Sequence, residues 1–122
     1  MNKSAQKPRV LVVDDHPKIL KFIELDLKLR GFDVICADCG ENALKLVNSA
    51  RPDVLLLDIA MPGMDGFEVI KTLRASSSLP IIAFSASPSN QHNAIQLGAN
   101  DFMPKPFDSD VMARKIQALL PV

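Results

Sequence analysis

The chain has 122 residues, of which 48% are hydrophobic, so it can bury one core and fits the usual size of a single domain. Its 14 basic and 14 acidic residues cancel, which argues against a protein that binds nucleic acid or an anionic membrane through its overall charge. No apolar run is long enough to span a bilayer, and residues 1–7 lack the apolar core of a signal peptide. We therefore expect a cytoplasmic protein with one domain over residues 1–122, beginning with a flexible segment at residues 1–8.

Short apolar runs alternate along the chain with amphipathic segments. The runs are rich in β-branched residues and are bounded by polar residues, proline or glycine, which is typical of strands buried in a parallel sheet. The amphipathic segments have the period of helices. In chain order the predicted elements are a strand at 9–13, a helix at 17–30, a strand at 32–37, a helix from 38 or 39 to 50, a strand at 54–58, a helix at 67–75, a strand at 81–85, a helix at 89–97, a strand at 101–103 and a helix at 108–120.

The last two strand–helix units differ from the others. The helix at 89–97 has few apolar residues, so we expect it to be held weakly. Pro104 follows the strand at 101–103, and because proline removes a ladder donor, this strand belongs at an edge of the sheet. Five strands alternating with five helices predict one doubly wound α/β domain with a parallel sheet, right-handed crossovers and helices on both faces.

Polar residues stand where four of the five predicted strands end. Asp14 and Asp15 follow the first strand, Asp58 ends the third, Ser85 ends the fourth and Lys105 follows the fifth. Because the carboxyl ends of parallel strands share one edge of the sheet, we expect these side chains to converge. Asp58 alone could simply begin a turn, since aspartate is a common turn residue. The combination instead predicts a functional site.

Three carboxylates brought together repel one another, so the site requires a compensating cation. Oxygen ligands of this kind favour Mg²⁺, which keeps waters and phosphate oxygens in its octahedral shell. Lys105 supplies a second positive charge that can hold a phosphoryl oxygen. A carboxylate flanked by Mg²⁺ and lysine is equipped to attack phosphorus, which predicts an aspartyl phosphate on Asp58. The hydroxyl of Ser85 can then bind a phosphoryl oxygen.

With these residues, essentially the whole chain resembles the receiver domain of two-component response regulators, including the single-domain chemotaxis regulators. The motifs are the pair Asp14-Asp15, Asp58 with residues 59–66, the pair Ser85-Ala86 and the pair Lys105-Pro106, whose peptide bond is often cis in relatives. The resemblance implies a flavodoxin-like (βα)5 fold with strand order 2-1-3-4-5. It also implies that Asp58 is phosphorylated by a histidine kinase or a histidine phosphotransfer protein.

The resemblance further implies a role for each residue of the acidic site. Asp15, Asp58 and the backbone carbonyl of Ala60 would ligate Mg²⁺, and Asp14 would contribute through water. Lys105 would bind the phosphoryl group. No direct binding of nucleic acid or of a membrane is expected for this domain.

Ser85 and Phe102 would form the family's switch pair, which changes the surface of the fourth helix, the fifth strand and the fifth helix, where a downstream target or output domain binds. Phe102 replaces the commoner tyrosine and lacks its hydroxyl, so an ordinary core position is the alternative for this residue. Ala60 and Ser87, which border the phosphoryl group in the family, are small and uncharged and predict open access for water. The start of the chain suggests an N-terminal receiver, and residues 121–122 are either a natural end or the boundary before an output domain.

Two other functions can be weighed against a phosphorylated switch. A phosphatase of the haloacid-dehalogenase type also uses an aspartate nucleophile with Mg²⁺, but it needs a second aspartate where this chain has Ala60. A binding module that has kept the fold without phosphorylation would not need the complete set of acids, lysine and hydroxyl. Nucleotide binding is disfavoured because no glycine-rich phosphate loop follows the first strand.

The cysteines and histidines offer weaker signals. Cys36 and Cys39 have C-x-x-C spacing, but Cys36 belongs to a strand pattern and no glycine-proline lies between the two, which favours reduced apolar side chains over a redox pair. The two histidines, His16 and His92, show no ligand spacing to these thiols. We interpret His16 as a residue that begins the first helix.

Overall fold

The computed structural model describes residues 7–121. The strands are β1 (Arg9–Val13), β2 (Asp33–Ala37), β3 (Val54–Asp58), β4 (Ile81–Ser85) and β5 (Asp101–Pro104). The helices are α1 (Pro17–Leu29), α2 (Gly40–Ala50), α3 (Gly66–Arg74), α4 (Asn90–Leu97) and α5 (Ser109–Leu119). Each predicted strand and helix is therefore present in the predicted order. The segment predicted to be flexible, residues 1–8, lies outside the described residues except for Lys7 and Pro8.

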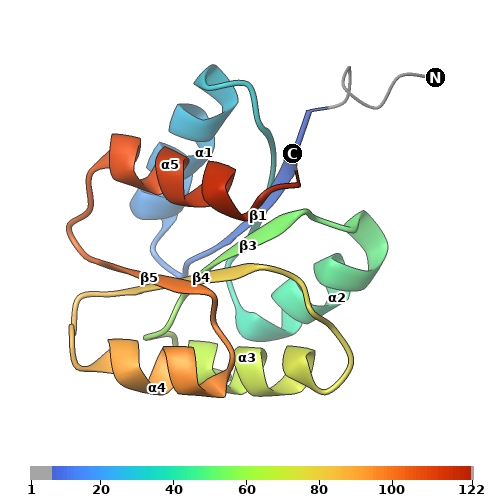
Figure 1. Ribbon diagram of the computed structural model, residues 1–122, viewed down its shortest axis with the longest axis vertical. Coiled ribbons are helices and arrows are strands. Elements are labelled where there is room, and N and C mark those ends of the chain that lie inside the picture. The colour runs from blue at the N-terminus through green and yellow to red at the C-terminus, as the bar shows by residue number, and fades with distance from the viewer. Residues whose placement is uncertain (1–6, 122) are drawn as a thin grey trace.

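The five strands form one parallel sheet in the order β2-β1-β3-β4-β5. Helices α1 and α5 cover one face, and α2, α3 and α4 cover the other (Figure 1). The doubly wound fold and the strand order are as predicted. β5 lies at an edge, where Pro104 costs no internal ladder bond. Within residues 7–121, no helix has the length and apolar character needed to cross a membrane.

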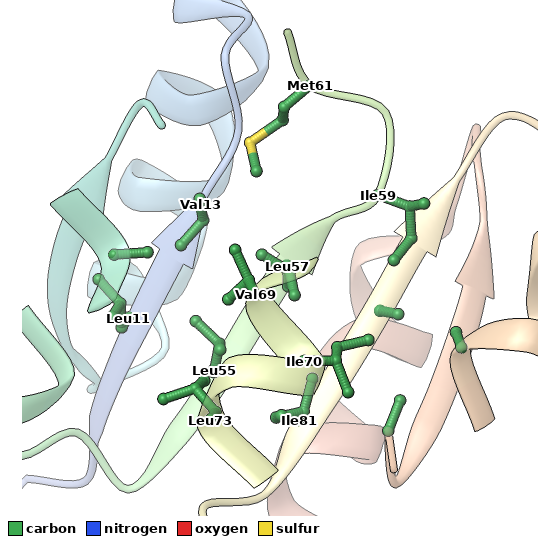
Figure 2. Packing of buried hydrophobic residues seen from close by; sticks show 14 of the residues in the cluster. Leu11, Val13, Leu55, Leu57, Ile59, Met61, Val69, Ile70, Leu73 and Ile81 are labelled. Carbon is green, nitrogen blue, oxygen red and sulfur yellow. The ribbon is translucent and has the colours of Figure 1, made fainter. Parts of the chain in front are cut away.

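The continuous apolar runs are explained by burial of the sheet on both faces. In β3, Leu55 and Leu57 face the core under α2, α3 and α4, whereas Val54 and Leu56 face the core under α1 and α5. Figure 2 shows Val69 of α3 packed over the leucines of β3. A strand with apolar residues on both faces is held in a fixed position, so the residue that ends β3 is placed reproducibly at the edge of the sheet.

The element ends follow local backbone chemistry. Gly31 has a φ of 95°, and the N–H of Phe32 donates to the carbonyl of Leu27 over 3.0 Å, which closes α1. Phe32 belongs to this turn, and β2 begins at Asp33, one residue later than predicted. The side chain of Asp65 caps α3 by accepting from the N–H of Glu68 at 3.0 Å.

Helix α4 is the least anchored helix by burial, because Ala94 is its only buried residue. Its C-terminal end is held by the guanidinium of Arg74, at the end of α3. That group donates to the carbonyl of Gly98 (2.9 Å), the carbonyl of Ser77 (3.1 Å), the carbonyl of Leu79 (2.7 Å) and the side chain of Asn100 (3.0 Å). Arg74 therefore joins α3, the loop before β4 and the turn after α4.

Candidate functional site

Three polar residues are buried among residues 7–121, and all three stand at the carboxyl ends of strands. Asp14 follows β1 and is 0% exposed, Asp58 ends β3 at 1%, and Ser85 ends β4 at 1%. Burial of polar groups is costly unless they are paired, so their position at one edge of the sheet is informative. Lys105 follows β5 beside them, and its backbone N–H donates to the carbonyl of Ser85 over 2.8 Å.

The amine of Lys105 connects two of these carboxylates. Its Nζ lies 3.3 Å from Asp14 Oδ2 and 3.5 Å from Asp58 Oδ1. It also stands 5.0 Å from the centre of the Phe84 ring, and a lysine over an aromatic ring gains a favourable cation–π interaction. The lysine side chain is 16% exposed. The predicted convergence of Asp14, Asp58 and Lys105, which lie far apart in sequence, is therefore observed.

Asp58 is held in an environment that opposes its negative charge. The pKa of Asp58 is raised to about 6, first by burial and then by the negative charge of Asp14. The amine of Lys105 and the backbone N–H of Ala60, which donates to Asp58 Oδ1 over 3.3 Å, act in the opposite direction. Above pH 7 the carboxylate is mostly ionised. Its ionised form is disfavoured in the fold, because the nearby positive charge does not fully offset burial and the charge of Asp14. Such a group is suited to a reaction that neutralises it.

A cation would fit the acidic cluster. Asp14, Asp15, His16 and Asp58 each offer one ligand atom, and these atoms lie within 4.8 Å of one another. Asp15 Oδ1 and Asp58 Oδ2 are buried and accept no hydrogen bond. Two buried carboxylate oxygens without donors are the ligands that a hard divalent cation prefers, and Mg²⁺ is such a cation. The donor set therefore fits the predicted Mg²⁺.

Asp14 differs from Asp15 because its oxygens already have protein donors. Asp14 Oδ1 accepts from the backbone N–H of His16 (2.8 Å), and Asp14 Oδ2 accepts from Lys105. The His16 ring Nδ1 also lies 3.1 Å from Asp14 Oδ1 and 3.2 Å from Asp15 Oδ1, although only the contact with Asp14 has hydrogen-bond geometry. His16 begins α1, as predicted, but its contact with both acids was not predicted. Its position directly after two acids was the signal available in the sequence.

Four further residues were given roles by prediction, namely Ser85 and Phe102 as a switch pair and Ala60 and Ser87 as neighbours of the phosphoryl group. Phe102 is 5% exposed and belongs to the core under α2, α3 and α4. Ser85 Oγ accepts from the N–H of Ser87 (3.0 Å) and from the side-chain amide of Asn90 (2.9 Å). Ala60 and Ser87 are exposed. Asn90 was not predicted, because in the sequence it is one of several polar residues in a helix with few apolar side chains. The Lys105-Pro106 bond is cis.

Cys36 lies in β2, and Cys39 is the residue before α2. Both are free thiols and half-buried. Burial raises the pKa of the Cys36 thiol, which lowers its thiolate fraction and hence its reactivity at neutral pH.

Comparison with known proteins finds a family model and solved structures that match most of this chain. The family model of the response regulator receiver domain matches residues 10–117. The receiver domain of the Francisella response regulator 1452 is 35% identical, with a TM-score of 0.87, over 93% of this chain and 96% of its own. The chemotaxis response regulator CheY4 of Vibrio cholerae is 32% identical, with a TM-score of 0.86, over 94% of this chain and 100% of its own. The response regulator protein TrrA of Thermotoga maritima, solved in complex with Mg(2+)-BeF, is 33% identical, with a TM-score of 0.86, over 93% of this chain and 99% of its own.

The matched range contains every strand end that carries the site, from Asp14 after β1 to Lys105 after β5. Fold, strand order and family match therefore agree with one another. This chain belongs to the response regulator receiver domain family of two-component systems.

Proposed function

We propose that this domain is a phosphorylation-controlled switch that works in the cytoplasm, and that Asp58 accepts a phosphoryl group from the phosphohistidine of a histidine kinase or a histidine phosphotransfer protein. The observation that carries the proposal is the state of Asp58. Its carboxylate is 1% exposed, has a pKa of about 6, and lies 3.5 Å from the amine of Lys105 at the carboxyl edge of the sheet. A buried carboxylate with a nearby cation is equipped to act as a nucleophile.

In the proposed reaction an Asp58 oxygen forms a bond to phosphorus while the bond from phosphorus to the donor histidine breaks. The donor imidazole leaves with the electron pair of that bond and takes up a proton from solvent. Lys105 holds a phosphoryl oxygen and balances its charge. Mg²⁺ bound by Asp15, Asp58 and the backbone carbonyl of Ala60 would supply positive charge for the phosphoryl oxygens.

The difference between the two neighbouring acids supports their proposed roles. Asp15 has a buried oxygen without a donor, so it is free to ligate a cation directly. Both oxygens of Asp14 accept from protein donors, which suits a contribution through water. Asp14 also holds the amine of Lys105 in place.

After transfer, we propose that the hydroxyl of Ser85 donates to a phosphoryl oxygen and that the ring of Phe102 follows. The surface of α4, β5 and α5 then changes, and a downstream target or output domain binds one of the two states more tightly. The weak burial of α4 supports this, because a helix with one buried residue moves at low cost.

Incubation with acetyl phosphate and Mg²⁺, followed by intact mass spectrometry, tests the proposal. We expect a gain of about 80 Da, the mass of one phosphoryl group. The gain disappears in Asp58→Asn and in the presence of EDTA. Asp65→Asn is the matched control, because it makes the same chemical change in the same loop and asparagine also caps helices. The absence of a gain with acetyl phosphate and with a phosphorylated histidine phosphotransfer protein contradicts the proposal.

The same experiment separates a switch from a phosphatase. A switch takes up about one phosphoryl group per chain and then releases it slowly, whereas a phosphatase consumes phosphodonor over many turnovers. Ala60 offers an exposed methyl group where the phosphatase would need a carboxylic acid. Release of inorganic phosphate at hundreds of turnovers per minute would favour the phosphatase.

A further inference from the structure

The hydroxyl of Ser85 is hydrogen-bonded to residues at the start of α4 and not to the acidic cluster. Ser85 Oγ accepts from the backbone N–H of Ser87 at 3.0 Å and from the side-chain amide of Asn90 at 2.9 Å. Ser87 lies in the loop before α4, and Asn90 is the first residue of α4. Within residues 7–121, Ser85 Oγ makes these two hydrogen bonds, and neither of them involves Asp58 or Lys105. The hydroxyl thus faces the start of α4.

The number of hydrogen bonds that a hydroxyl can make limits the further partners of Ser85 while these two bonds are present. A serine oxygen accepts at two lone pairs and donates one proton. The two N–H donors fill the two acceptor positions and fix the direction in which the oxygen points. The main chain of Ser85 cannot follow freely, because its carbonyl accepts from the N–H of Lys105 over 2.8 Å. Movement toward a phosphoryl group therefore requires rotation of the side chain, and rotation breaks the bond from Asn90.

Asn90 also ties the N-terminal end of α4 to the sheet. It is the first residue of α4, and its bond to Ser85 is the one side-chain hydrogen bond made by a residue of this helix, Asn90–Leu97. The preceding N-cap residue, Ser89, makes no capping bond. The opposite end of α4 is held by Arg74 through the carbonyl of Gly98. Of these two attachments, only that of Asn90 contacts a residue of the site.

We propose that Asn90 is a positioning residue that holds the Ser85 hydroxyl against α4 and thereby opposes binding of a phosphoryl group at Asp58. Release of this bond frees the hydroxyl for the phosphoryl oxygen and frees the first turn of α4 at the same time. This inference rests on the proposed function, because it assumes that Ser85 approaches the phosphoryl group.

Titration with BeF₃⁻ in saturating Mg²⁺ tests the role of Asn90, with BeF₃⁻ as a stable mimic of the phosphoryl group. The chain has no tryptophan or tyrosine, so isothermal titration calorimetry is the measurement of choice. We expect Asn90→Ala to bind BeF₃⁻ about two- to tenfold more tightly, the effect of losing one competing hydrogen bond. Asn93→Ala is the matched control, since Asn93 is exposed on the same helix, and its affinity should equal that of the parent protein.

An aspartate at the same position should reverse the sign. The carboxylate of Asn90→Asp accepts the single proton of Ser85, which is the proton that a phosphoryl oxygen needs. We expect this variant to bind BeF₃⁻ several-fold more weakly than the parent. A merely structural role for Asn90 predicts that both substitutions change affinity in the same direction, and that result overturns the proposal.

A double-mutant cycle shows whether Asn90 acts through Ser85. In a Ser85→Ala background, Asn90→Ala should leave BeF₃⁻ affinity unchanged. Tighter binding that persists in this background, or weaker binding by Asn90→Ala in the parent, overturns the role of Asn90. If the parent protein itself fails to bind BeF₃⁻ in an Asp58-dependent way, the proposed function fails along with it. If parent binding depends on Asp58 but ignores Asn90, only this further inference fails.

Discussion

Asp58→Asn should stabilise the metal-free protein at neutral pH, although it removes the proposed phosphorylation site. The carboxyl of Asp58 has an ordinary value of 3.8 in the unfolded chain and a pKa of about 6 in the fold. That difference corresponds to about 3 kcal/mol of unfavourable free energy when the group is ionised. Asparagine has the same shape and no charge, so it removes this penalty. A gain of this size raises the Tm of a domain of this length by roughly 10 °C.

The sign of the pH dependence follows from the raised pKa of Asp58. As the pH rises from about 4 to about 6, the unfolded chain has already lost this proton while the folded chain still holds it. The folded state is therefore progressively destabilised through this window. The full penalty is present above the folded pKa and absent below the unfolded one. The advantage of Asp58→Asn should accordingly be largest at pH 7.5 and small at pH 4.

Urea unfolding followed by far-ultraviolet circular dichroism measures this effect. The parent, Asp58→Asn and the control Asp65→Asn are compared in EDTA at pH 7.5 and pH 4, and again at pH 7.5 with Mg²⁺. We expect Asp65→Asn to stay within about 0.5 kcal/mol of the parent. Mg²⁺ should narrow the gap, because a bound cation offsets the same repulsion. An Asp58→Asn variant no more stable than the parent at pH 7.5, or one with an equal advantage at pH 4, would refute the electrostatic reasoning.

Three further substitutions test the supports of the site. Gly66→Ala should lower the free energy of unfolding by more than about 2 kcal/mol, because its Cβ would stand 2.6 Å from Ile59 Cα and 2.7 Å from the Asp58 carbonyl oxygen. An unchanged free energy of unfolding in urea would contradict this. Arg74→Ala should lower the free energy of unfolding by about 2 to 4 kcal/mol, since four acceptors lose a charged donor. The rate of amide hydrogen exchange should then rise at the C-terminal end of α4. If exchange rises equally along all helices, the local role is wrong. Lys105→Met should raise the pKa of Asp58 further, because the amine that lowers it is removed. A carbon-13 titration of the Asp58 carboxyl that shows the same pKa in the variant and the parent would contradict this.

Much of the site was predictable because it depends on where strands end. The apolar run at residues 54–57 predicts a buried strand, and the polar Asp58 marks where that strand ends. Parallel topology then brings the ends of such strands to one edge of the sheet. This is why Asp14, Asp58 and Lys105 could be grouped although they lie far apart along the chain. The cap of α3 is likewise a local feature, because Asp65 lies only three positions before Glu68, whose N–H donates to it.

The contacts of individual side chains were decided only by the tertiary structure. Arg74 reads as a solvent-facing cation in the last turn of a helix, yet its guanidinium binds acceptors from two other segments. Asn90 reads as an exposed polar residue, yet its amide holds the hydroxyl of Ser85. Such contacts depend on the direction of each side chain once helices and strands have packed, and sequence periodicity carries no information on that direction. The sequence by itself determined the elements, their order and the carboxylate at the end of β3. Packing decided which oxygens of the acidic cluster have donors, and which side chain donates to the hydroxyl of Ser85.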